Sequence, residues 1–260
     1  MENILEIKNL SKYFGGLAAV SNCSLNVKRG TITGIIGPNG SGKTTLFNLI
    51  AGNLKSSAGN VLFNNENITN IPSYELFSKG LLRTFQIAHE FTNLSVLENL
   101  MMVPGNQSGE ELMNALMKPG LVAKEESQIK DKAMEVVDFL NLSYLKNELA
   151  GNLSGGQKKL LELGRTMMVD SKLVLLDEVG AGVNRTLLKD LGTAIEKLNK
   201  EKGYTFCMIE HDMDFIGRLC DPVIVMAEGS VLFEGSVEDA KKDERVIESY
   251  LGRGSKLKDN

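Results

Sequence analysis

The sequence has no excess of positive charge. Its 260 residues include 29 Lys and Arg against 33 Asp and Glu, which gives a net charge of −4 with both histidines neutral. Proteins that bind nucleic acid through a broad surface usually carry clustered basic residues on it. We therefore expect no nucleic-acid partner.

Long apolar runs are also missing. A membrane-spanning helix needs about 20 predominantly apolar residues in succession, and no segment here approaches that length. The opening MENILEIKNL contains no basic segment followed by an apolar one, so it predicts the start of a folded domain and not a targeting segment. The length is sufficient for a full core, in one domain or in one domain with an insertion.

Cysteine is scarce as well. Cys23, Cys207 and Cys220 are odd in number, lie in apolar surroundings and show no metal-like spacing. This pattern predicts buried free thiols in a reducing cytosol, with no disulfide framework and no metal site.

The pattern that is present predicts strands first and alternating strands and helices later. Strands are expected over 4–10, 20–30 and 31–36, with a further strand pair around 59–63 that turns at Asn64 and Asn65. Helical spacing dominates residues 110–149, after a looser stretch at 102–109. We expect residues 253–260 to form a disordered tail.

The second half of the chain alternates between the two element types. A helix is expected after Ser154, a strand over 173–176, a helix through 188–198, a strand over 205–209 and a hairpin over 223–233. Such alternation predicts a parallel sheet covered by helices.

Residues 37–44 read GPNGSGKT and match G-x-x-x-x-G-K-[ST] at every fixed position. Glycines let successive backbone N–H groups turn inward around a polyphosphate, and the N-terminus of the next helix adds positive charge. Lys43 would reach the β- and γ-phosphates, and the Thr44 hydroxyl would bind Mg²⁺. The alternative is a glycine-rich surface turn, but the apolar strand before and the helical spacing after favour a nucleotide site.

The motif does not identify the base of the nucleotide. GTP-binding proteins usually carry N-K-x-D, and the nearest segment here, residues 199–202, lacks the aspartate. This weakens the GTPase hypothesis without excluding it.

An acidic pair follows a short apolar run at LVLLDE, residues 173–178. Asp177 ends the expected strand, where nucleotide-hydrolysing enzymes hold Mg²⁺ through a carboxylate. Glu178 must point elsewhere because alternate strand residues face opposite ways, and it could activate the attacking water. The alternative is that both acids only end a strand at the surface.

Residues 153–157 read LSGGQ, in which Ser154 and two glycines begin the next expected helix. Such a helix start could bind an anion or could be an ordinary capped turn. Together with GPNGSGKT and LVLLDE it resembles the signature sequence of ATP-binding cassette (ABC) proteins, and the resemblance covers nearly the whole chain.

This resemblance implies an α/β fold: a P-loop NTPase (RecA-like) core with an antiparallel β subdomain and an inserted α-helical subdomain. The expected divisions are a nucleotide-binding core over 1–87 and 158–240, a helical signature subdomain over 88–157, and a C-terminal helix and tail over 241–260. The implied cofactors are ATP and Mg²⁺.

The resemblance also implies roles for single residues. Phe14 would stack on adenine, although it could instead be a buried aromatic at a strand end. Gln86 in RTFQ would contact the metal and sense the partner, Asn184 would signal across a dimer seam, and His211 would contact the γ-phosphate. His89 matches no motif and is expected to be structural.

The implied nucleotide-binding residues are Phe14, Gly37, Pro38, Asn39, Gly40, Ser41, Gly42, Lys43, Thr44, Thr45, Ser154, Gly155, Gly156, Gln157 and Asn184. The implied metal ligands are Thr44, Gln86 and Asp177. The implied catalytic residues are Glu178, His211 and Gln86.

In this family the signature of one subunit closes over the ATP of another, so a dimer with two composite sites is implied. Ser154 and Gly156 would hold the γ-phosphate of the partner's ATP. Integral-membrane permease subunits are the other implied partners, which places the chain on the cytoplasmic face of the membrane. Whether the dimer is homo- or heteromeric stays open.

Five segments resemble the larger ATPase subunit of branched-chain amino-acid importers more closely: KYFGGLAAV, LLRTFQ, VLENLMMV, AGVNRT and VIESYLG. In such systems other subunits bind the solute, so urea or short amides remain alternatives to branched-chain amino acids. An ATP-dependent interaction module with slow hydrolysis is the alternative from another class.

The sequence departs from the family at Val179, where proline usually follows the glutamate, and at Arg185. Proline favours extended backbone angles in the preceding residue, and a β-branched valine also prefers the extended region. We therefore expect Glu178 to be only modestly looser, at a cost of about 1 kcal/mol or several-fold in rate.

Overall fold

The computed structural model describes residues 2–84, 90–105 and 107–251 of the chain. These divide into two compact units. Unit 1 comprises Met1–Arg83, Lys172–Gly180 and Ile195–Asn260, and unit 2 comprises Thr84–Ser171 and Ala181–Ala194. The functional subdomain boundaries expected from the sequence stay a prediction, and the expected disordered tail at 253–260 lies outside the described residues.

Unit 1 contains a six-stranded sheet in the order β10-β9-β3-β8-β7-β6. Its strands are β3 (Ile32–Ile36), β6 (Leu81–Arg83), β7 (Leu173–Asp177), β8 (Thr205–Ile209), β9 (Val223–Ala227) and β10 (Ser230–Gly235). All neighbouring pairs are parallel except β9 with β10.

The predicted parallel sheet and the predicted hairpin are therefore confirmed. Every residue of β3, β7 and β8 is buried, as is typical of parallel strands that are covered on both faces. The carboxyl ends of these three strands share one edge of the sheet, so the segments that follow them come together there.

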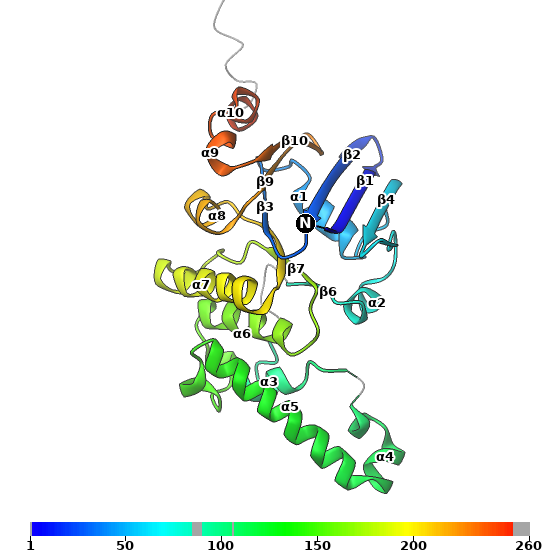
Figure 1. Cartoon of the computed structure of the whole chain (residues 1–260), viewed down its shortest axis with the longest axis vertical. Coiled ribbons are helices and arrows are strands. Elements are labelled where there is room, and N and C mark those ends of the chain that lie inside the picture. The colour runs from blue at the N-terminus through cyan, green and yellow to red at the C-terminus, as the bar shows by residue number, and fades with distance from the viewer. Residues whose placement is uncertain (1, 85–89, 106, 252–260) are drawn as a thin grey trace, which may run out of the picture. The chain divides into compact units, whose positions relative to one another are not determined.

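A second, antiparallel sheet of unit 1 has the order β2-β1-β4-β5. It is built from β1 (Asn3–Phe14), β2 (Leu17–Lys28), β4 (Ala58–Phe63) and β5 (Glu66–Asn67), with β1 and β2 in blue in Figure 1. Asn64 and Asn65 have φ values of 50° and 63°, which asparagine tolerates better than most residues. The turn predicted there is confirmed.

The helices of unit 1 are α1 (Lys43–Ile50), α2 (Ser73–Ser78), α8 (Met213–Leu219), α9 (Val237–Ala240) and α10 (Glu244–Leu251). Phe47 of α1 is fully buried in a core cluster that also includes Leu5 of the antiparallel sheet and Ile35 of the parallel sheet. This cluster fixes α1, and with it the segment that precedes α1.

All three cysteines are free and buried, as the sequence predicted. Burial raises the pKa of Cys23 to about 11 and that of Cys207 to about 12, and it also raises the pKa of Cys220. At neutral pH these thiols stay protonated, which makes them poor nucleophiles and poor metal ligands.

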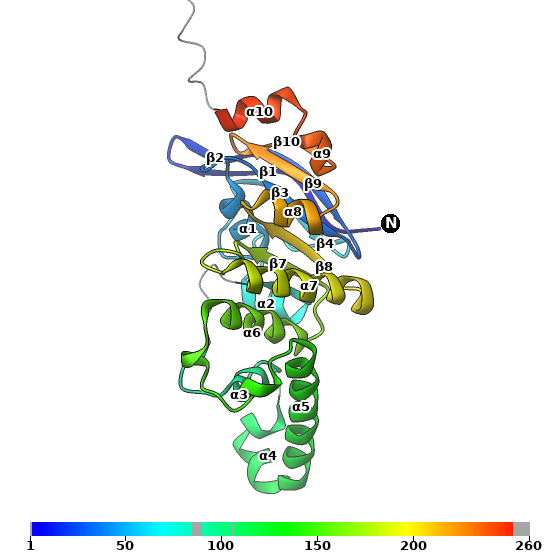
Figure 2. The same ribbon diagram turned by 90° about the vertical axis from the view of Figure 1, so that its left-hand side faces the viewer.

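Unit 2 is helical, as Figure 2 shows for its green segments. It contains α3 (Val96–Met101), α4 (Leu112–Met117), α5 (Pro119–Phe139), α6 (Gly155–Met167) and short 3₁₀ turns at Ser108–Glu110, Ser143–Leu145 and Ala150–Asn152. A Cβ at Gly164 of α6 would lie 2.7 Å from Leu140 and 3.1 Å from Val136, so glycine allows α6 to pack closely against the end of α5.

The helical pattern predicted over 110–149 is confirmed, although Pro119 begins a new helix within it. Proline is favoured in the first turn of a helix because its missing N–H has no partner there. α7 (Arg185–Lys202) begins in unit 2 and ends in unit 1. None of the helices formed by the described residues is long and apolar enough to cross a membrane.

Candidate functional site

The GPNGSGKT segment joins β3 to α1, in the strand–loop–helix context that the sequence predicted. Gly42 precedes α1 with φ 97°, and a Cβ there would lie 2.3 Å from the Ala19 carbonyl oxygen. A Cβ at Gly37 would lie 2.1 Å from the Met226 carbonyl oxygen. No side chain caps the start of α1, so the first amide groups of this helix are available to an anion.

Lys43 is buried at the start of α1, and its ammonium group closes the loop. Its Nζ donates to the carbonyl oxygens of Gly37 at 2.8 Å and Pro38 at 3.0 Å. Burial lowers the pKa of Lys43, while the negative charges of Glu178 and Asp177 act in the opposite direction. The charges of the acidic pair therefore act on Lys43, although 134 positions separate Lys43 from Asp177 in the sequence.

Asp177 ends β7 with only 3% of its surface exposed. Its Oδ2 accepts a hydrogen bond of 2.6 Å from Nη2 of Arg83, the last residue of β6. Nη1 of Arg83 donates to Oδ1 of Asn48 in α1, also at 2.6 Å. The hypothesis that Asp177 only ends a strand at the surface is therefore wrong, since the carboxylate is buried and paired.

Arg83 was not identified from the sequence, although it is the first residue of the RTFQ segment. The strand that carries it has only three residues, too few for a periodic pattern. A basic residue three positions before Gln86 was the available signal. Gln86 itself and His89 lie outside the described residues.

Glu178 and His211 are brought into direct contact although 33 positions separate them. Oε1 of Glu178 lies 3.0 Å from Nε2 of His211, and the backbone N–H of Glu178 donates to the Ile209 carbonyl oxygen at 2.9 Å. The side chains are 22% and 48% exposed, respectively. The pair can therefore reach a bound molecule and still orient each other.

The backbone of Glu178 is not extended. Its φ is +48°, in the left-handed region that residues other than glycine, asparagine and aspartate rarely adopt. A proline at position 179 would have disfavoured helical angles in Glu178, whereas Val179, which is buried, places no such restriction on it. The backbone bond to Ile209 then holds the strained residue.

Glu210 lies directly before His211 and was not identified from the sequence. It is 5% exposed, its Oε1 accepts from the Gly180 N–H at 2.7 Å, and its Oε2 accepts from the His211 N–H at 3.2 Å. Burial raises the pKa of Glu210, the two backbone hydrogen bonds lower it, and the Glu178 charge raises it further. An acidic residue directly after the largely apolar segment TFCMI was the available signal.

The LSGGQ segment begins α6 in unit 2. Ser154 caps this helix, because its hydroxyl accepts from the Gln157 N–H while Gln157 Oε1 accepts from the Ser154 N–H at 2.9 Å. A Cβ at Gly156 would lie 2.5 Å from Leu187 of α7, whose N–H donates to Oδ1 of Asn184 at 2.9 Å. The capped turn is thus observed, and anion binding by the same helix start stays a prediction.

Phe14 ends β1 with 47% of its surface exposed. The alternative of a buried aromatic at a strand end is therefore wrong. Nζ of Lys12 lies 5.1 Å from the centre of the ring, a distance compatible with a cation–π contact. An exposed ring is available for stacking, and that role stays a prediction.

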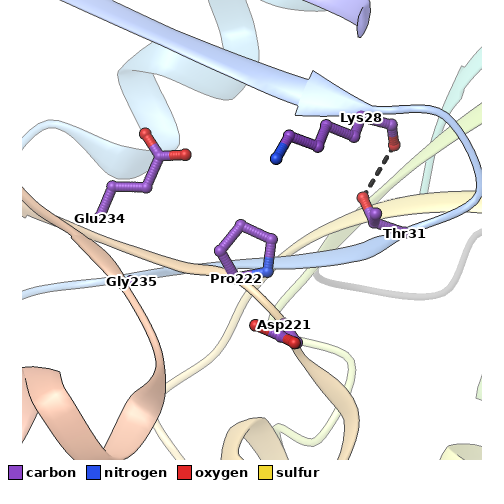
Figure 3. Close-up of a pocket in the computed structure, with 6 residues that line it drawn as sticks. All are labelled: Lys28, Thr31, Asp221, Pro222, Glu234 and Gly235. Atoms are coloured by element: carbon purple, nitrogen blue, oxygen red, sulfur yellow. Dashed lines mark hydrogen bonds between the residues drawn. The ribbon is translucent and has the colours of Figure 1, made fainter. Parts of the chain in front are cut away.

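A separate hollow of unit 1 lies away from these residues (Figure 3). It is lined by Lys28, Thr31, Asp221, Pro222, Glu234 and Gly235. Thr31 and Pro222 directly precede β3 and β9, so the hollow lies at the amino ends of the parallel strands. Ligands of open α/β sheets bind at the carboxyl ends, which is where the phosphate loop, Asp177 and His211 lie.

Among the residues that the structure describes, no group of three or more His, Cys, Asp or Glu side chains is arranged to hold a metal ion. A divalent cation here would depend on a hydroxyl and a carboxylate of the protein together with oxygens of a bound phosphate. Oxygen ligands of this kind suit Mg²⁺, which often retains phosphate oxygens and water in its coordination shell.

Comparison with known proteins identifies relatives along nearly the whole chain. The sequence pattern of the family described as ABC transporter matches residues 20–181. A probable branched-chain amino acid transport ATP-binding protein LivG of Archaeoglobus fulgidus is 43% identical over 249 residues, which cover 96% of this chain and 95% of that protein. A high-affinity branched-chain amino acid transport ATP-binding protein LivG of Escherichia coli is 32% identical over 249 residues, covering 96% and 98%.

The similarity extends to three dimensions. The crystal structure of a nucleotide-free ATP-binding cassette from an ABC transporter superposes with a TM-score of 0.83 at 40% identity, over 96% of this chain and all of that one. The dimeric structure of a post-hydrolysis state of an ATP-binding cassette bound to ADP and Pi gives a TM-score of 0.72 at 25% identity, over 90% and 98%. The predicted fold class is confirmed.

Proposed function

The chain belongs to the ABC transporter family, and on that basis we propose that it is the ATP-hydrolysing subunit of an importer for branched-chain or related amino acids. The observation that supports hydrolysis is the 3.0 Å contact of Glu178 with His211. The negative charges of Glu178 and Asp177 also act on Lys43 of the phosphate loop. The solute is assigned from relatives that are branched-chain amino acid transport ATP-binding proteins, and urea or short amides are the alternative cargo.

ATP would bind with its phosphates in the loop at 37–42 and its adenine against Phe14. Lys43 would exchange the carbonyl oxygens of Gly37 and Pro38 for phosphate oxygens, which are stronger acceptors because they are charged. The uncapped amide groups of α1 would add further donors. Thr44, Asp177 and Gln86 would hold Mg²⁺, which neutralises phosphate charge during phosphoryl transfer.

Glu178 would act as the general base that accepts a proton from the attacking water. Its carboxylate is partly exposed, so water can reach it, while Oε1 is oriented by the imidazole of His211. His211 would in addition donate a hydrogen bond to the γ-phosphate. Because Glu178 and His211 are hydrogen-bonded to each other, the base and the group that contacts the phosphate would keep a fixed distance. The attacking water would then be oriented toward the phosphorus, and such orientation supplies much of a catalyst's effect.

A second ATPase subunit would complete each site. The start of α6, with Ser154, Gly155, Gly156 and Gln157, would present its hydroxyl and amide groups to the γ-phosphate of the partner's ATP, and Asn184 would lie at the seam. Integral-membrane permease subunits would anchor the dimer to the cytoplasmic face of the membrane and provide the path for the solute. The dimer would consist either of two copies of this chain or of this chain and a different ATPase.

The test of the proposed function is steady-state ATP hydrolysis by the purified chain beside Glu178→Gln, which keeps the size of the side chain and removes the base. We expect the variant to lose turnover and to accumulate as an ATP-bound dimer, detectable by size-exclusion chromatography. Glu234→Gln, at the hollow on the opposite edge, is the matched control and should hydrolyse ATP normally. Equal rates for the chain and Glu178→Gln would overturn the assignment of the base.

Transport itself is tested with the permease subunits present. Co-purification followed by uptake of labelled branched-chain amino acids would identify the cargo. ATP-dependent dimerisation with negligible turnover and no uptake would instead support the interaction-module alternative.

A further inference from the structure

Three successive residues at the carboxyl end of β8 hold the short segment 178–180 that follows β7. The Ile209 carbonyl oxygen accepts from the Glu178 N–H at 2.9 Å, Glu210 Oε1 accepts from the Gly180 N–H at 2.7 Å, and His211 Nε2 lies 3.0 Å from Glu178 Oε1. Two of these contacts use backbone or imidazole atoms. The contact of Glu210 is the one made by a carboxylate that takes no part in the proposed chemistry.

The segment requires such support because Glu178 has a left-handed backbone, with φ +48°. Residues other than glycine keep this conformation only where their surroundings over-determine it. The bonds to Ile209 and Glu210 bracket the strained residue, one at its own N–H and one at the N–H two positions later. Without the second bond, Gly180 could rotate and Glu178 could return to a more favoured conformation.

Burying the Glu210 carboxylate costs free energy, which a purely structural contact would not require. Its side chain is 95% shielded from solvent, and a buried carboxylate loses hydration that hydrogen bonds replace only in part. Both of its oxygens are used, since Oε2 accepts from the His211 N–H at 3.2 Å. One carboxylate therefore ties together the segments that carry the base and the imidazole.

We propose that Glu210 is a positioning residue for ATP hydrolysis: its carboxylate holds the Gly180 and His211 amides so that the Glu178 carboxylate and the His211 imidazole stay at hydrogen-bond distance. The inference rests on the proposed function, because it assigns Glu210 a role in the same hydrolytic site. It contacts neither nucleotide nor metal in this assignment and acts through its two neighbours.

A positioning role makes a specific prediction for the kinetic constants. Glu210→Ala removes both accepted hydrogen bonds, so the base and the imidazole lose their mutual alignment while the phosphate loop is untouched. We expect kcat to fall by about tenfold to a hundredfold, the range expected for a small misplacement of catalytic groups, and KM for ATP to stay within about twofold.

The conservative variant separates positioning from general destabilisation. In Glu210→Gln the amide oxygen can still accept from the Gly180 N–H, but the NH₂ group cannot accept from the His211 N–H. We expect kcat of Glu210→Gln to lie between those of Glu210→Ala and the unaltered chain. Urea unfolding of both variants reports folding, and Glu234→Gln again serves as the control for removal of a glutamate charge.

The outcomes are distinguishable. Unaltered kcat in Glu210→Ala would overturn the inference, as would a loss that appears in KM alone. If Glu210→Ala does not fold, Glu210→Gln decides, and an unaltered kcat in that variant would overturn the inference. Failure of the proposed function is a different result, in which the unaltered chain itself does not hydrolyse ATP or Glu178→Gln hydrolyses it at the same rate.

Discussion

Replacing Glu178 with glycine should give a more stable protein than replacing it with alanine, contrary to the usual order of these two residues. Both variants lose the carboxylate and its contact with His211, so they differ only at the backbone. At φ +48° the Cβ of alanine meets the steric cost of the left-handed conformation, about 1–2 kcal/mol. Glycine avoids this cost.

Glycine carries its own penalty, because it loses more conformational freedom on folding than alanine, by about 0.5–1 kcal/mol. The free energy of unfolding of Glu178→Gly should therefore exceed that of Glu178→Ala by about 0.5–1 kcal/mol. With a urea m-value of about 3 kcal/mol per M, the midpoint of Glu178→Gly would exceed that of Glu178→Ala by about 0.2–0.3 M.

The assay is urea unfolding of both variants by circular dichroism, with a matched pair at Lys197 as the control. Lys197 is exposed on α7, where Lys197→Gly should be about 1 kcal/mol less stable than Lys197→Ala. The two pairs therefore have opposite signs. If alanine at position 178 proved as stable as glycine, Glu178 would not be strained, and the bracketing role of Ile209 and Glu210 would lose its basis.

Two further predictions concern the buried polar and thiol groups. Arg83→Leu should lower the free energy of unfolding by about 3–5 kcal/mol, because it leaves the buried Asp177 carboxylate without the guanidinium that pairs with it. The control is Arg29→Leu, which removes an exposed pair with Glu2 and should change the free energy of unfolding by less than about 0.5 kcal/mol in the same urea assay. A small effect at Arg83 would mean that water or another cation replaces the guanidinium. The folded chain should not react with a thiol-specific reagent at pH 8. The reason is that burial raises the pKa of Cys23 to about 11 and of Cys207 to about 12 and also raises the pKa of Cys220. When the chain is unfolded in urea, all three thiols should react. Since the thiolate is the reactive form, any native labelling should increase as the pH rises; rapid labelling at pH 8 would contradict the burial.

Much of the fold could be predicted because its signals are local. The apolar runs of β3, β7 and β8, the glycine-rich loop before Lys43 and the cap at Ser154 each depend on a few adjacent residues, and the structure has all of them in the expected places. Short elements such as β6 escaped prediction, since three residues carry no periodic pattern.

The sequence by itself pointed to the chemical groups that the proposed function uses: the phosphate loop, the acidic pair at 177–178, the LSGGQ helix start and His211. Only the tertiary structure decided how they are held. Arg83 reaches Asp177, and Glu210 reaches Gly180, across neighbouring strands and over separations of 94 and 30 residues. The left-handed backbone of Glu178 likewise accompanies a hydrogen bond to Ile209, which is 31 positions away in the chain but lies on the neighbouring strand. Contacts between strands depend on sheet order and register, which no short stretch of sequence contains.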